Sequence, residues 1–402
     1  MVAKETKRRK GQKAQSMNDE KKRIYLDHAA TTPIRQEVLL EISRAFEEFG
    51  NPSSIYREGQ RAKALLEKSR RRIASVLHAQ AGEIYFTGSG TESNNWAIKG
   101  MALRHADKGK HIITSSIEHP ALLGACKTLE KQGFFVSYLP VDEQGQIAPD
   151  TLEAAIRPDT ICVSIMVANN EIGTILPITE LAHICKERNI PFHTDAVQAV
   201  GSIHVDVNEL GIDMLSLSGH KLYAPKGIGV LYIRNGINIS AYLDGGAQER
   251  GKRAGTENLP YLVGLAAAME SAATEMDESI KRLSSWRDML IAKIESTISD
   301  CHLNGHRTKR LPGNISFSFK GIEGESLLLL LDQAGFACSS GSACSSGAID
   351  PSHVLTAIGL SKEMANAALR ITLGKSNKEE DVHTFIQVLA EQVKKLRAIS
   401  NF

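Results

Sequence analysis

Ser216-Leu217-Ser218-Gly219-His220-Lys221 carries the strongest signal in this chain, together with His193-Thr194-Asp195-Ala196-Val197-Gln198 shortly before it. In each stretch a polar side chain comes at or just after the end of a short segment that we expect to be a buried strand. Asp195 lies at the end of one such strand, and Lys221 follows the next. Open α/β sheets bind ligands outside the carboxyl ends of their strands. The two stretches therefore predict an α/β fold with a ligand site at this edge of the sheet.

The residue types at this edge indicate a cofactor. A lysine amine condenses with an aldehyde once burial has lowered its pKa from the ordinary value of about 10.4. A carboxylate such as Asp195 can pair with a protonated ring nitrogen, and Gln198 can donate to a phenolic oxygen on the same ring. A lysine and an acidic partner for a pyridinium are the minimal protein equipment for pyridoxal 5′-phosphate. For either residue alone, a structural lysine or a helix-capping aspartate is the simpler interpretation.

The segments on both sides of these stretches alternate between strand and helix patterns. Strands alternating with helices imply a largely parallel sheet that is covered on both faces. We expect strands at 83–87, 111–115, 134–141, 160–167, 191–194, 214–217 and 229–234, and helices at 92–106, 120–132, 149–156 and 178–189.

Beyond about residue 275 the pattern changes to that of a smaller α+β domain. Asp350 before Pro351 predicts an N-cap with proline in the first helical turn. The predicted domains are a disordered basic tail (1–23), a large cofactor-binding domain (24–275) and a small C-terminal domain (276–402). Within the small domain we expect helices at 277–298, from 325, from 350 and at 377–398, and strands at 314–319 and 368–373.

Composition is that of an ordinary water-soluble protein, with 42% hydrophobic and 23% charged residues in 402. No apolar run approaches the roughly 18 residues that span a bilayer, so no membrane contact is expected. Residues 1–23 carry nine Lys or Arg and three Asp or Glu, a net charge of +6, which leaves −4 on the rest. A solvated tail is the simpler interpretation, and contact with nucleic acid or an acidic partner is the alternative. The six cysteines show no Cys-x-x-Cys pair, which favours a reducing cytoplasm.

Three further segments add polar groups where strands are expected to end. Thr87-Gly88-Ser89-Gly90-Thr91-Glu92 joins a strand to a helix, so its backbone N–H groups, with Gly90 and Thr91, can hold a phosphate. His119 follows the next strand, where it can stack on a ring and move protons near neutral pH. Asn170 lies after a third strand. Each is weak evidence alone, and Ser218 and His220 complete the set around Lys221.

With these residues in place, the chain resembles the cysteine desulfurases of the NifS/IscS type, which are fold-type I pyridoxal phosphate enzymes of the class V aminotransferase family. The matching motifs run in family order and leave uncovered only the basic tail and the last helix. Besides the two stretches above they are 25–32 (YLDHAATT), 50–54 (GNPSS), 90–94 (GTESN), 118–120 (EHP), 169–173 (NNEIG), 246–250 (GAQER), 253–258 (RAGTEN) and 369–374 (LRITLG).

The resemblance implies conversion of L-cysteine to L-alanine with formation of a persulfide on Cys344. It implies a homodimer in which Thr256 of one subunit reaches the cofactor phosphate of the other. Arg370 is implied to bind the substrate carboxylate, a task that suits the planar guanidinium, with Asn51 assisting. The sulfur acceptor is implied to be an iron–sulfur scaffold or a tRNA-thiolation protein. No metal site is expected, although Cys344 could transiently bind an iron–sulfur cluster.

Cys344 lies in a segment, 339–347, in which seven of nine residues are Ser or Gly, and such a composition predicts mobility. Cys338 falls where the family does not require cysteine. We interpret it as a buried core thiol, with a resolving thiol as the alternative. Tyr56 stands where the family often has a histidine near Arg57, which leaves only local detail of substrate entry open.

Three other functions are compatible with parts of this pattern. An aminotransferase on the same fold would need Lys221 and Asp195, but would leave Cys344 without a purpose. A selenocysteine lyase would use the same residues as a cysteine desulfurase. A non-enzymatic scaffold is disfavoured because every expected cofactor-contact position is intact.

Overall fold

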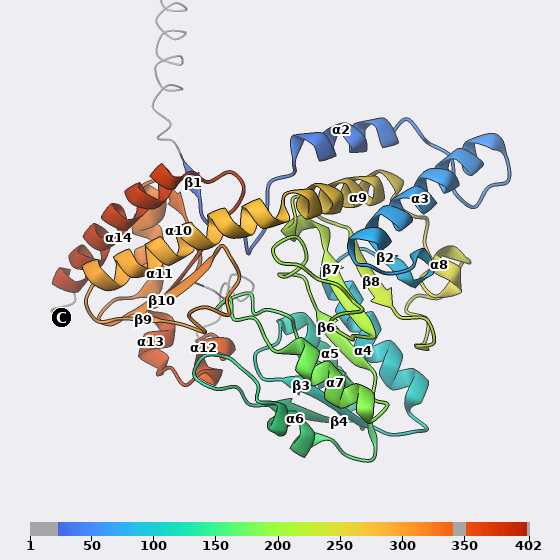
Figure 1. Ribbon diagram of the computed structural model, residues 1–402, viewed down its shortest axis with the longest axis horizontal. Helices are drawn as coiled ribbons and strands as arrows, with labels where there is room; N and C mark the ends of the chain where they lie inside the picture. Colours follow the sequence, from blue (N-terminus) through green and yellow to red (C-terminus); the bar gives the residue numbers. More distant parts are fainter. Residues whose placement is uncertain (1–22, 341–350, 400–402) are drawn as a thin grey trace, which may run out of the picture.

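The computed structural model describes residues 23–340 and 351–399, and within these ranges the larger part of the chain is built around a seven-stranded sheet (Figure 1). The strand order is β2-β8-β7-β6-β5-β3-β4. Strands β4, β3, β5, β6 and β7 run parallel, and β8 is antiparallel to both β7 and β2. The strands are β2 (Ile84–Thr87), β3 (His111–Ser115), β4 (Phe135–Leu139), β5 (Thr160–Ser164), β6 (Phe192–Asp195), β7 (Met214–Ser218) and β8 (Gly229–Ile233).

Both faces of this sheet are buried, because successive residues of a strand belong to different cores. Phe86 and Ile113 face a core that α2, α3, α7 and α9 complete. Their neighbours Tyr85 and Ile112 face a second core, completed by α4 and α5. These alternating side chains agree with the two-residue period of a strand. The helices are α2 (Gln36–Ala45), α3 (Arg57–Val76), α4 (Gly90–His105), α5 (Pro120–Lys131), α6 (Pro149–Ala155), α7 (Ile178–Glu187), α8 (Gln248–Gly251) and α9 (Leu259–Thr274).

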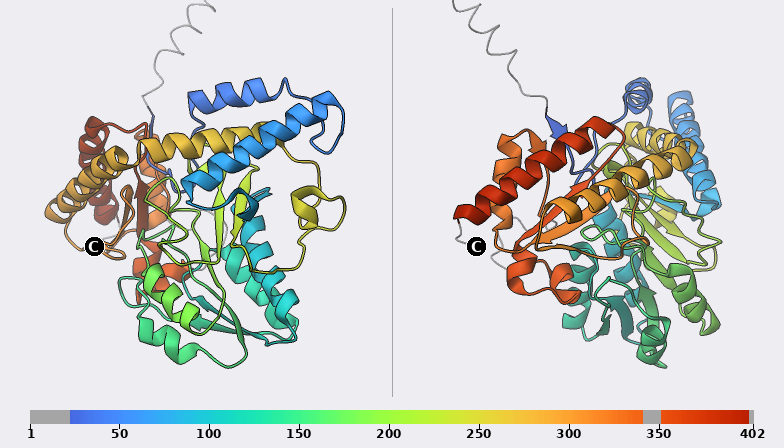
Figure 2. Two further views of the ribbon diagram at one scale, coloured as in Figure 1. Left: turned by 45° about the vertical axis from the view of Figure 1, so that its right-hand side comes forward. Right: turned by 60° about the vertical axis from the view of Figure 1, so that its left-hand side comes forward.

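The smaller part of the chain has a three-stranded antiparallel sheet of order β12-β10-β9 with its own apolar core. Phe317 and Phe319 stack within this core, and Phe385 of the last helix packs into it. The two views in Figure 2 show the long helices α10 and α14 crossing one side of this sheet. The elements are α10 (Met276–Thr297), β9 (Cys301–Leu303), β10 (Asn314–Phe319), α11 (Gly324–Gln333), β11 (Phe336–Ala337), α12 (His353–Ala357), α13 (Lys362–Asn366), β12 (Ala368–Thr372) and α14 (Glu379–Ile399).

The first strand, β1 (Ile24–Tyr25), pairs in parallel with β11, more than half of the chain away. The next residue, Leu26, belongs to the core of the smaller part, and Asp27 forms a bridge to Thr372 at the end of β12. The described part of the chain therefore starts against the smaller part and then enters the larger one. The sequence pattern did not predict this pairing, and the domain boundaries given above stay predictions.

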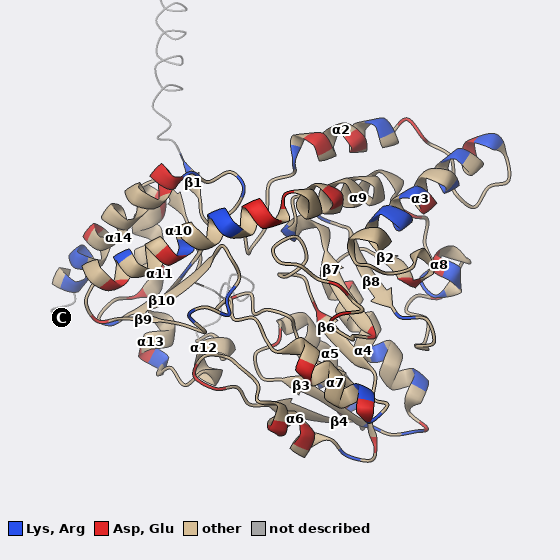
Figure 3. Ribbon diagram, in the orientation of Figure 1, with Lys and Arg blue, Asp and Glu red and all other residues tan. Residues whose placement is uncertain are grey.

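The predicted elements agree with the structure to within a few residues, with one clear error. Asp350 was expected to cap a helix that Pro351 opens. Helix α12 instead begins at His353, and Ser352 is its N-cap, because the Ser352 Oγ accepts the N–H groups of Val354 and Leu355. Figure 3 shows Lys, Arg, Asp and Glu gathered on outer helices such as α3, α10 and α14. None of the helices described here is long and apolar enough to cross a membrane.

Candidate active site

The carboxyl ends of four parallel strands bring the predicted site residues to one edge of the central sheet. His119 follows β3, Asn170 follows β5, Asp195 ends β6, and Lys221 follows β7. Strands β3, β5, β6 and β7 are neighbours in the sheet, so their ends lie side by side. The topology thus assembles residues that are separated by more than a hundred positions in the chain.

Asp195 is held in a fixed orientation by two donors. Its Oδ2 accepts the side-chain N–H of Asn94 at 2.6 Å, and its Oδ1 accepts the backbone N–H of Val197 at 2.9 Å. The side chain of Asn94 comes from α4, which packs against β6. Asp195 is only 5% exposed. A carboxylate that is fixed and shielded in this way can pair strongly with a protonated nitrogen.

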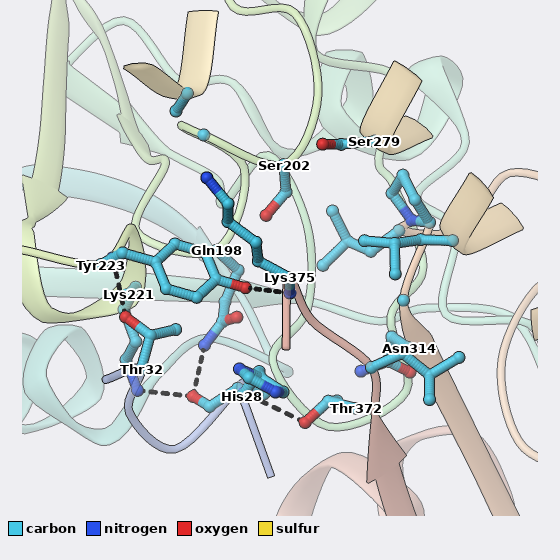
Figure 4. A pocket seen from close by; sticks show the side chains of 18 of the residues that line it. His28, Thr32, Gln198, Ser202, Lys221, Tyr223, Ser279, Asn314, Thr372 and Lys375 are labelled. Atoms are coloured by element: carbon cyan, nitrogen blue, oxygen red, sulfur yellow. Dashed lines mark hydrogen bonds between the residues drawn. The ribbon is translucent and has the colours of Figure 1, made fainter. Parts of the chain in front are cut away.

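Lys221 lies in a short 3₁₀ turn, Gly219–Lys221, directly after β7. Its Nζ donates to the carbonyl of Ala29 at 2.5 Å and to that of Ala30 at 2.6 Å. The Ala29 carbonyl also accepts the side-chain N–H of Gln198 at 3.0 Å. Figure 4 shows Lys221 and Gln198 converging on this acceptor beside His28. The segment that follows β1 therefore orients the lysine amine.

His119 is the N-cap of α5, where its Nδ1 accepts the backbone N–H of Ala121 at 3.1 Å. Burial lowers the pKa of His119, the Asp195 carboxylate opposes this shift, and the positive charge of Lys221 adds to it. The three groups therefore act on one another electrostatically. The imidazole is neutral near pH 7, which leaves its face available for stacking on an aromatic ring.

The start of α4 forms the candidate anion site. Ser89 caps the helix by accepting the backbone N–H of Glu92 at 3.1 Å. The next residue, Gly90, lies so close to the end of β7 that a Cβ there would be 2.7 Å from Val197 and 3.2 Å from Ser218. Only glycine allows the helix terminus, with its partial positive charge, to approach this closely. Thr91 follows in the first turn and is exposed.

His220 also belongs to this end of the site. Its Nδ1 lies 3.2 Å from the hydroxyl of Thr31. Burial, together with the smaller effects of the charges of Lys221 and Lys226, lowers the pKa of His220 to about 4. His220 is therefore a neutral ring near pH 7 and can donate one hydrogen bond to an anion.

Arg370, in β12, has a buried side chain that is 3% exposed. Its Nη2 donates to Asp27 Oδ1 at 2.8 Å, and its Nη1 donates to the carbonyl of Asn170 at 3.0 Å. The backbone of Arg370 pairs with that of Ser339. The predicted carboxylate-binding residue thus lies beside the segment that leads to Cys344, which itself is outside the described residues.

Ser352 and His353, which follow the undescribed segment 341–350, also contact residues near the strand ends. Ser352 donates its hydroxyl hydrogen to Glu171 Oε2 at 2.5 Å. The side-chain Nε2 of His353 lies 2.9 Å from the carbonyl of Glu118, the residue before His119. Both flanks of the undescribed segment 341–350 therefore contact residues next to the candidate site.

Thr256 and Asn51 lie together in a different place. Both line an open surface groove with Phe49 and Pro260. A separate cavity of about 80 Å³ contains Lys221, Gln198 and His28 among its lining residues (Figure 4), and none of its lining residues lines the groove. Within one chain, Asn51 is thus grouped with Thr256, and its expected role at the substrate carboxylate stays a prediction.

Two residues that the sequence interpretation did not single out have direct contacts with the site. Asn94 orients Asp195, and Asp27 pairs with Arg370. Both lie inside quoted motifs, so their positions could have been noticed, but their partners follow only from tertiary packing. Cys338 is a free thiol that packs against the core of the smaller part. Burial raises the pKa of Cys338, with a further contribution from Asp27, which agrees with the interpretation as a core thiol.

The chemistry of this donor set fits pyridoxal 5′-phosphate. Lys221 offers an amine for an aldehyde, Asp195 offers a fixed carboxylate for a ring nitrogen, and the start of α4 offers an anion site. The spacing imposed by Gly90 brings the anion site next to β7. One small molecule with an aldehyde, a ring nitrogen and a phosphate can use all three groups.

Comparisons with known proteins point to one family. The model of the aminotransferase class-V family matches residues 24–385. The cysteine desulfurase IscS of Methanosarcina thermophila is 53% identical over 387 residues, which is 96% of each chain. That of Dictyoglomus turgidum is 53% identical over 384 residues, 95% of this chain and 97% of the relative.

Solved structures give the same picture. A NifS-like protein superposes with a TM-score of 0.88 at 39% identity and covers 93% of this chain and 100% of its own. A structure of SspA in complex with cysteine has a TM-score of 0.77 at 38% identity, covering 87% of this chain and 98% of that one.

Proposed function

The chain belongs to the aminotransferase class-V family, and we propose that within this family it is a pyridoxal phosphate-dependent cysteine desulfurase that converts L-cysteine to L-alanine. The observation that supports this most strongly is the meeting of Lys221, Asp195 and His119 at adjacent strand ends. Similarity to curated cysteine desulfurases over nearly the whole chain favours this activity over others on the same fold.

The cofactor, when bound, supplies an electron sink that weakens bonds at the substrate Cα. Asp195 would hold the proton on the ring nitrogen, and Asn94 keeps that carboxylate in one orientation. The start of α4, with Ser218 and His220, binds the phosphate, and Gln198 donates to the phenolic oxygen. His119 packs against the ring with a neutral imidazole, because burial lowers its pKa.

Lys221 holds the aldehyde at rest and moves a proton at the substrate Cα during turnover. A lysine can do this only while its amine is neutral. The carbonyls of Ala29 and Ala30 accept hydrogen bonds from its Nζ and so hold the free amine at one position before the cofactor binds. His119 is the second candidate for moving the proton.

Arg370 binds the carboxylate of L-cysteine. Its guanidinium is buried, and its contacts with Asp27 and Asn170 leave it little freedom to change orientation. A bidentate guanidinium–carboxylate pair selects an α-amino acid over a simple amine. L-Cysteine is therefore held by its carboxylate at one end of the site while its amino group meets the cofactor.

The Cys344 thiolate attacks the sulfur of bound L-cysteine. A sulfur–sulfur bond forms as the substrate carbon–sulfur bond breaks, and the substrate carbon takes the electron pair and a proton. The products are L-alanine and a persulfide on Cys344. Transfer of the outer sulfur to an acceptor protein, an iron–sulfur scaffold or a tRNA-thiolation protein, completes the cycle.

We propose a homodimer that acts in the cytoplasm. Several large apolar side chains on α2 and the following segment are exposed, among them Phe46, Phe49 and Ile55, and the first two line the groove that contains Thr256. Exposed apolar patches of this kind mark protein interfaces. A second subunit seated here would cover them and receive Thr256 near its own cofactor phosphate.

The free thiols of the described cysteines agree with a reducing compartment.

The experiment that tests the proposal measures alanine and sulfide released from L-cysteine without any keto-acid acceptor, in the presence of a thiol reductant that removes the persulfide. A cysteine desulfurase produces both in equal amounts. An aminotransferase produces neither, because it converts L-cysteine to its keto acid and stops after one turnover without an acceptor, and that result would exclude the proposed activity. Reduction with borohydride should leave a cofactor adduct on Lys221, and the Lys221→Ala protein should show none, whereas Lys226→Ala should retain it.

A further inference from the structure

The segment from Tyr25 to Ala30 contacts both ends of the candidate site. At one end the Asp27 carboxylate pairs with Arg370, and at the other the Ala29 and Ala30 carbonyls hold Lys221. The segment is itself braced, because the hydroxyl of Tyr25 donates to the carbonyls of Asp27 and Thr31, both at 2.9 Å. The Ala30 N–H donates to the Asp27 carbonyl at 3.0 Å, which closes a tight turn.

We propose that Asp27 is a positioning residue, which fixes the guanidinium of Arg370 in the orientation that receives the substrate carboxylate. This inference rests on the proposed function. The bridge from Asp27 to Thr372 places Asp27 alongside β12, two residues from Arg370. Its carboxylate is 15% exposed, and the guanidinium is 3% exposed. The pair is therefore largely shielded from water, where a charge-assisted hydrogen bond has its full strength.

Asp27 and Asn170 contact different nitrogen atoms of the Arg370 guanidinium. Asp27 takes a hydrogen of Nη2 and the Asn170 carbonyl takes a hydrogen of Nη1. Two acceptors on different nitrogens define the plane of a guanidinium, whereas one acceptor lets it rotate. A side chain that is already fixed does not lose that freedom when the ligand binds, so the ligand binds more tightly.

Asp27 could affect ligand binding by positioning Arg370 or by its own negative charge, and these two effects predict opposite changes in affinity. If Asp27 acts through its hydrogen bond, Asp27→Ala weakens binding of a carboxylate ligand, and Asp27→Asn, which keeps the acceptor oxygen, restores most of it. If Asp27 acts mainly as a negative charge that repels the substrate carboxylate, both variants bind the ligand more tightly. The Asn variant thus separates the two effects without a change of size.

The experiment titrates holoenzyme with L-alanine and with ethylamine, which lacks the carboxylate, and follows the visible absorbance of the cofactor. Loss of one charged hydrogen bond predicts about tenfold weaker L-alanine binding in Asp27→Ala. Ethylamine binding should stay the same, and Asp27→Asn should fall within about threefold of the unsubstituted protein. The KM for L-cysteine should rise in parallel, with kcat much less affected.

Asp213→Ala is the matched control. Asp213 lies near Arg234 at the opposite end of β7 and accepts the backbone N–H of Phe192, so its loss removes another aspartate beside an arginine, far from the site. It should leave the ratio of L-alanine to ethylamine affinity unchanged.

Two results would overturn the inference. One is an unchanged ratio of L-alanine to ethylamine affinity in Asp27→Ala, which includes equal weakening of both ligands, and the other is tighter L-alanine binding in both Asp27 variants. If the unsubstituted protein itself does not prefer L-alanine to ethylamine, the proposed role of Arg370 fails, and the proposed function fails with it.

Discussion

Asn94 and Asp195 lie 101 residues apart in the chain, and a hydrogen bond of 2.6 Å joins their side chains at the centre of the candidate site. Asn94 belongs to α4, the helix whose first turn forms the anion site. One helix therefore forms the candidate anion site and also orients the Asp195 carboxylate, which we propose pairs with the ring nitrogen. A change in the position of α4 would affect both groups.

Asn94→Ala should weaken cofactor binding. A hydrogen bond to a charged group is worth about 1.5–3 kcal/mol, so the dissociation constant should rise by about tenfold or more. Titration of the apoenzyme with pyridoxal 5′-phosphate, followed by visible absorbance, measures this. Asn235→Ala is a control, since Asn235 is exposed and its side-chain amide donates to Gln80, far from the site. Equal affinities in the two variants would contradict the role given to Asn94.

Cys344→Ser should abolish sulfide release from L-cysteine and leave the visible absorbance of the bound cofactor unchanged. The hydroxyl is a far weaker nucleophile than a thiolate, and it cannot carry a persulfide. Cys338→Ala is the matched control, because the Cys338 thiol is buried and its pKa is raised. That variant should retain most of the activity. Continued turnover in Cys344→Ser would remove Cys344 from the mechanism.

His28 should make the protein less stable in acid. Burial lowers its pKa from 6.5 to about 4, so the unfolded chain binds a proton at a higher pH than the folded one. The contribution of His28 to stability is complete above pH 6.5 and is lost as the pH falls toward 4. Between pH 7 and pH 5 the loss is about 2 kcal/mol.

Urea unfolding of the apoenzyme at these two pH values provides the measurement. In His28→Phe, the decrease in unfolding free energy between them should be smaller by about 2 kcal/mol. His193 and His220 also have lowered pKa values, and they act equally in both proteins. The buried carboxyl of Glu118, with its pKa raised to about 8, has the opposite sign and cancels in the same comparison. An identical pH dependence in both proteins would refute the assignment.

Phe49→Asp should convert the proposed dimer to monomers. Phe49 is 82% exposed in the single chain, and burying a phenylalanine contributes about 1.5–3 kcal/mol, twice over in a symmetric pair. Sedimentation should show the change of mass, and cofactor affinity should fall because Thr256 no longer reaches the other subunit. Leu329→Asp, at a 66% exposed leucine of α11, should stay dimeric. A dimeric Phe49→Asp protein would place the interface elsewhere.

The sequence was sufficient to predict the residues at the strand ends. Asp195 ends a strand, and Lys221 and His119 follow strands within a few residues, so the order of strands and helices along the chain locates such positions without knowledge of the fold. The parallel arrangement then brings them together, since the carboxyl ends of parallel strands share one edge. The comparisons agree with the family that these motifs indicated.

Contacts between distant segments could not be predicted in the same way. The partner of Asn94 depends on which face of α4 packs over β6, and that face carries no periodic signal because α4 is buried on most sides. The pairing of β1 with β11 joins two segments of only two residues each. Ser352 caps α12 in place of the expected Asp350, and the contact of Ser352 with Glu171 depends on tertiary packing that the sequence does not reveal.

The pairing of β1 with β11 also has a consequence for biosynthesis. A ribosome delivers Ile24 and Tyr25 early, yet their strand partners are Phe336 and Ala337, and Asp27 must wait for Thr372. Until then the segment that carries the Ala29 and Ala30 carbonyls lacks these partners. Residues up to 372 must therefore be synthesised before the vitamin-derived group can meet a completed pocket, and a nascent chain that stops short of β12 should emerge colourless.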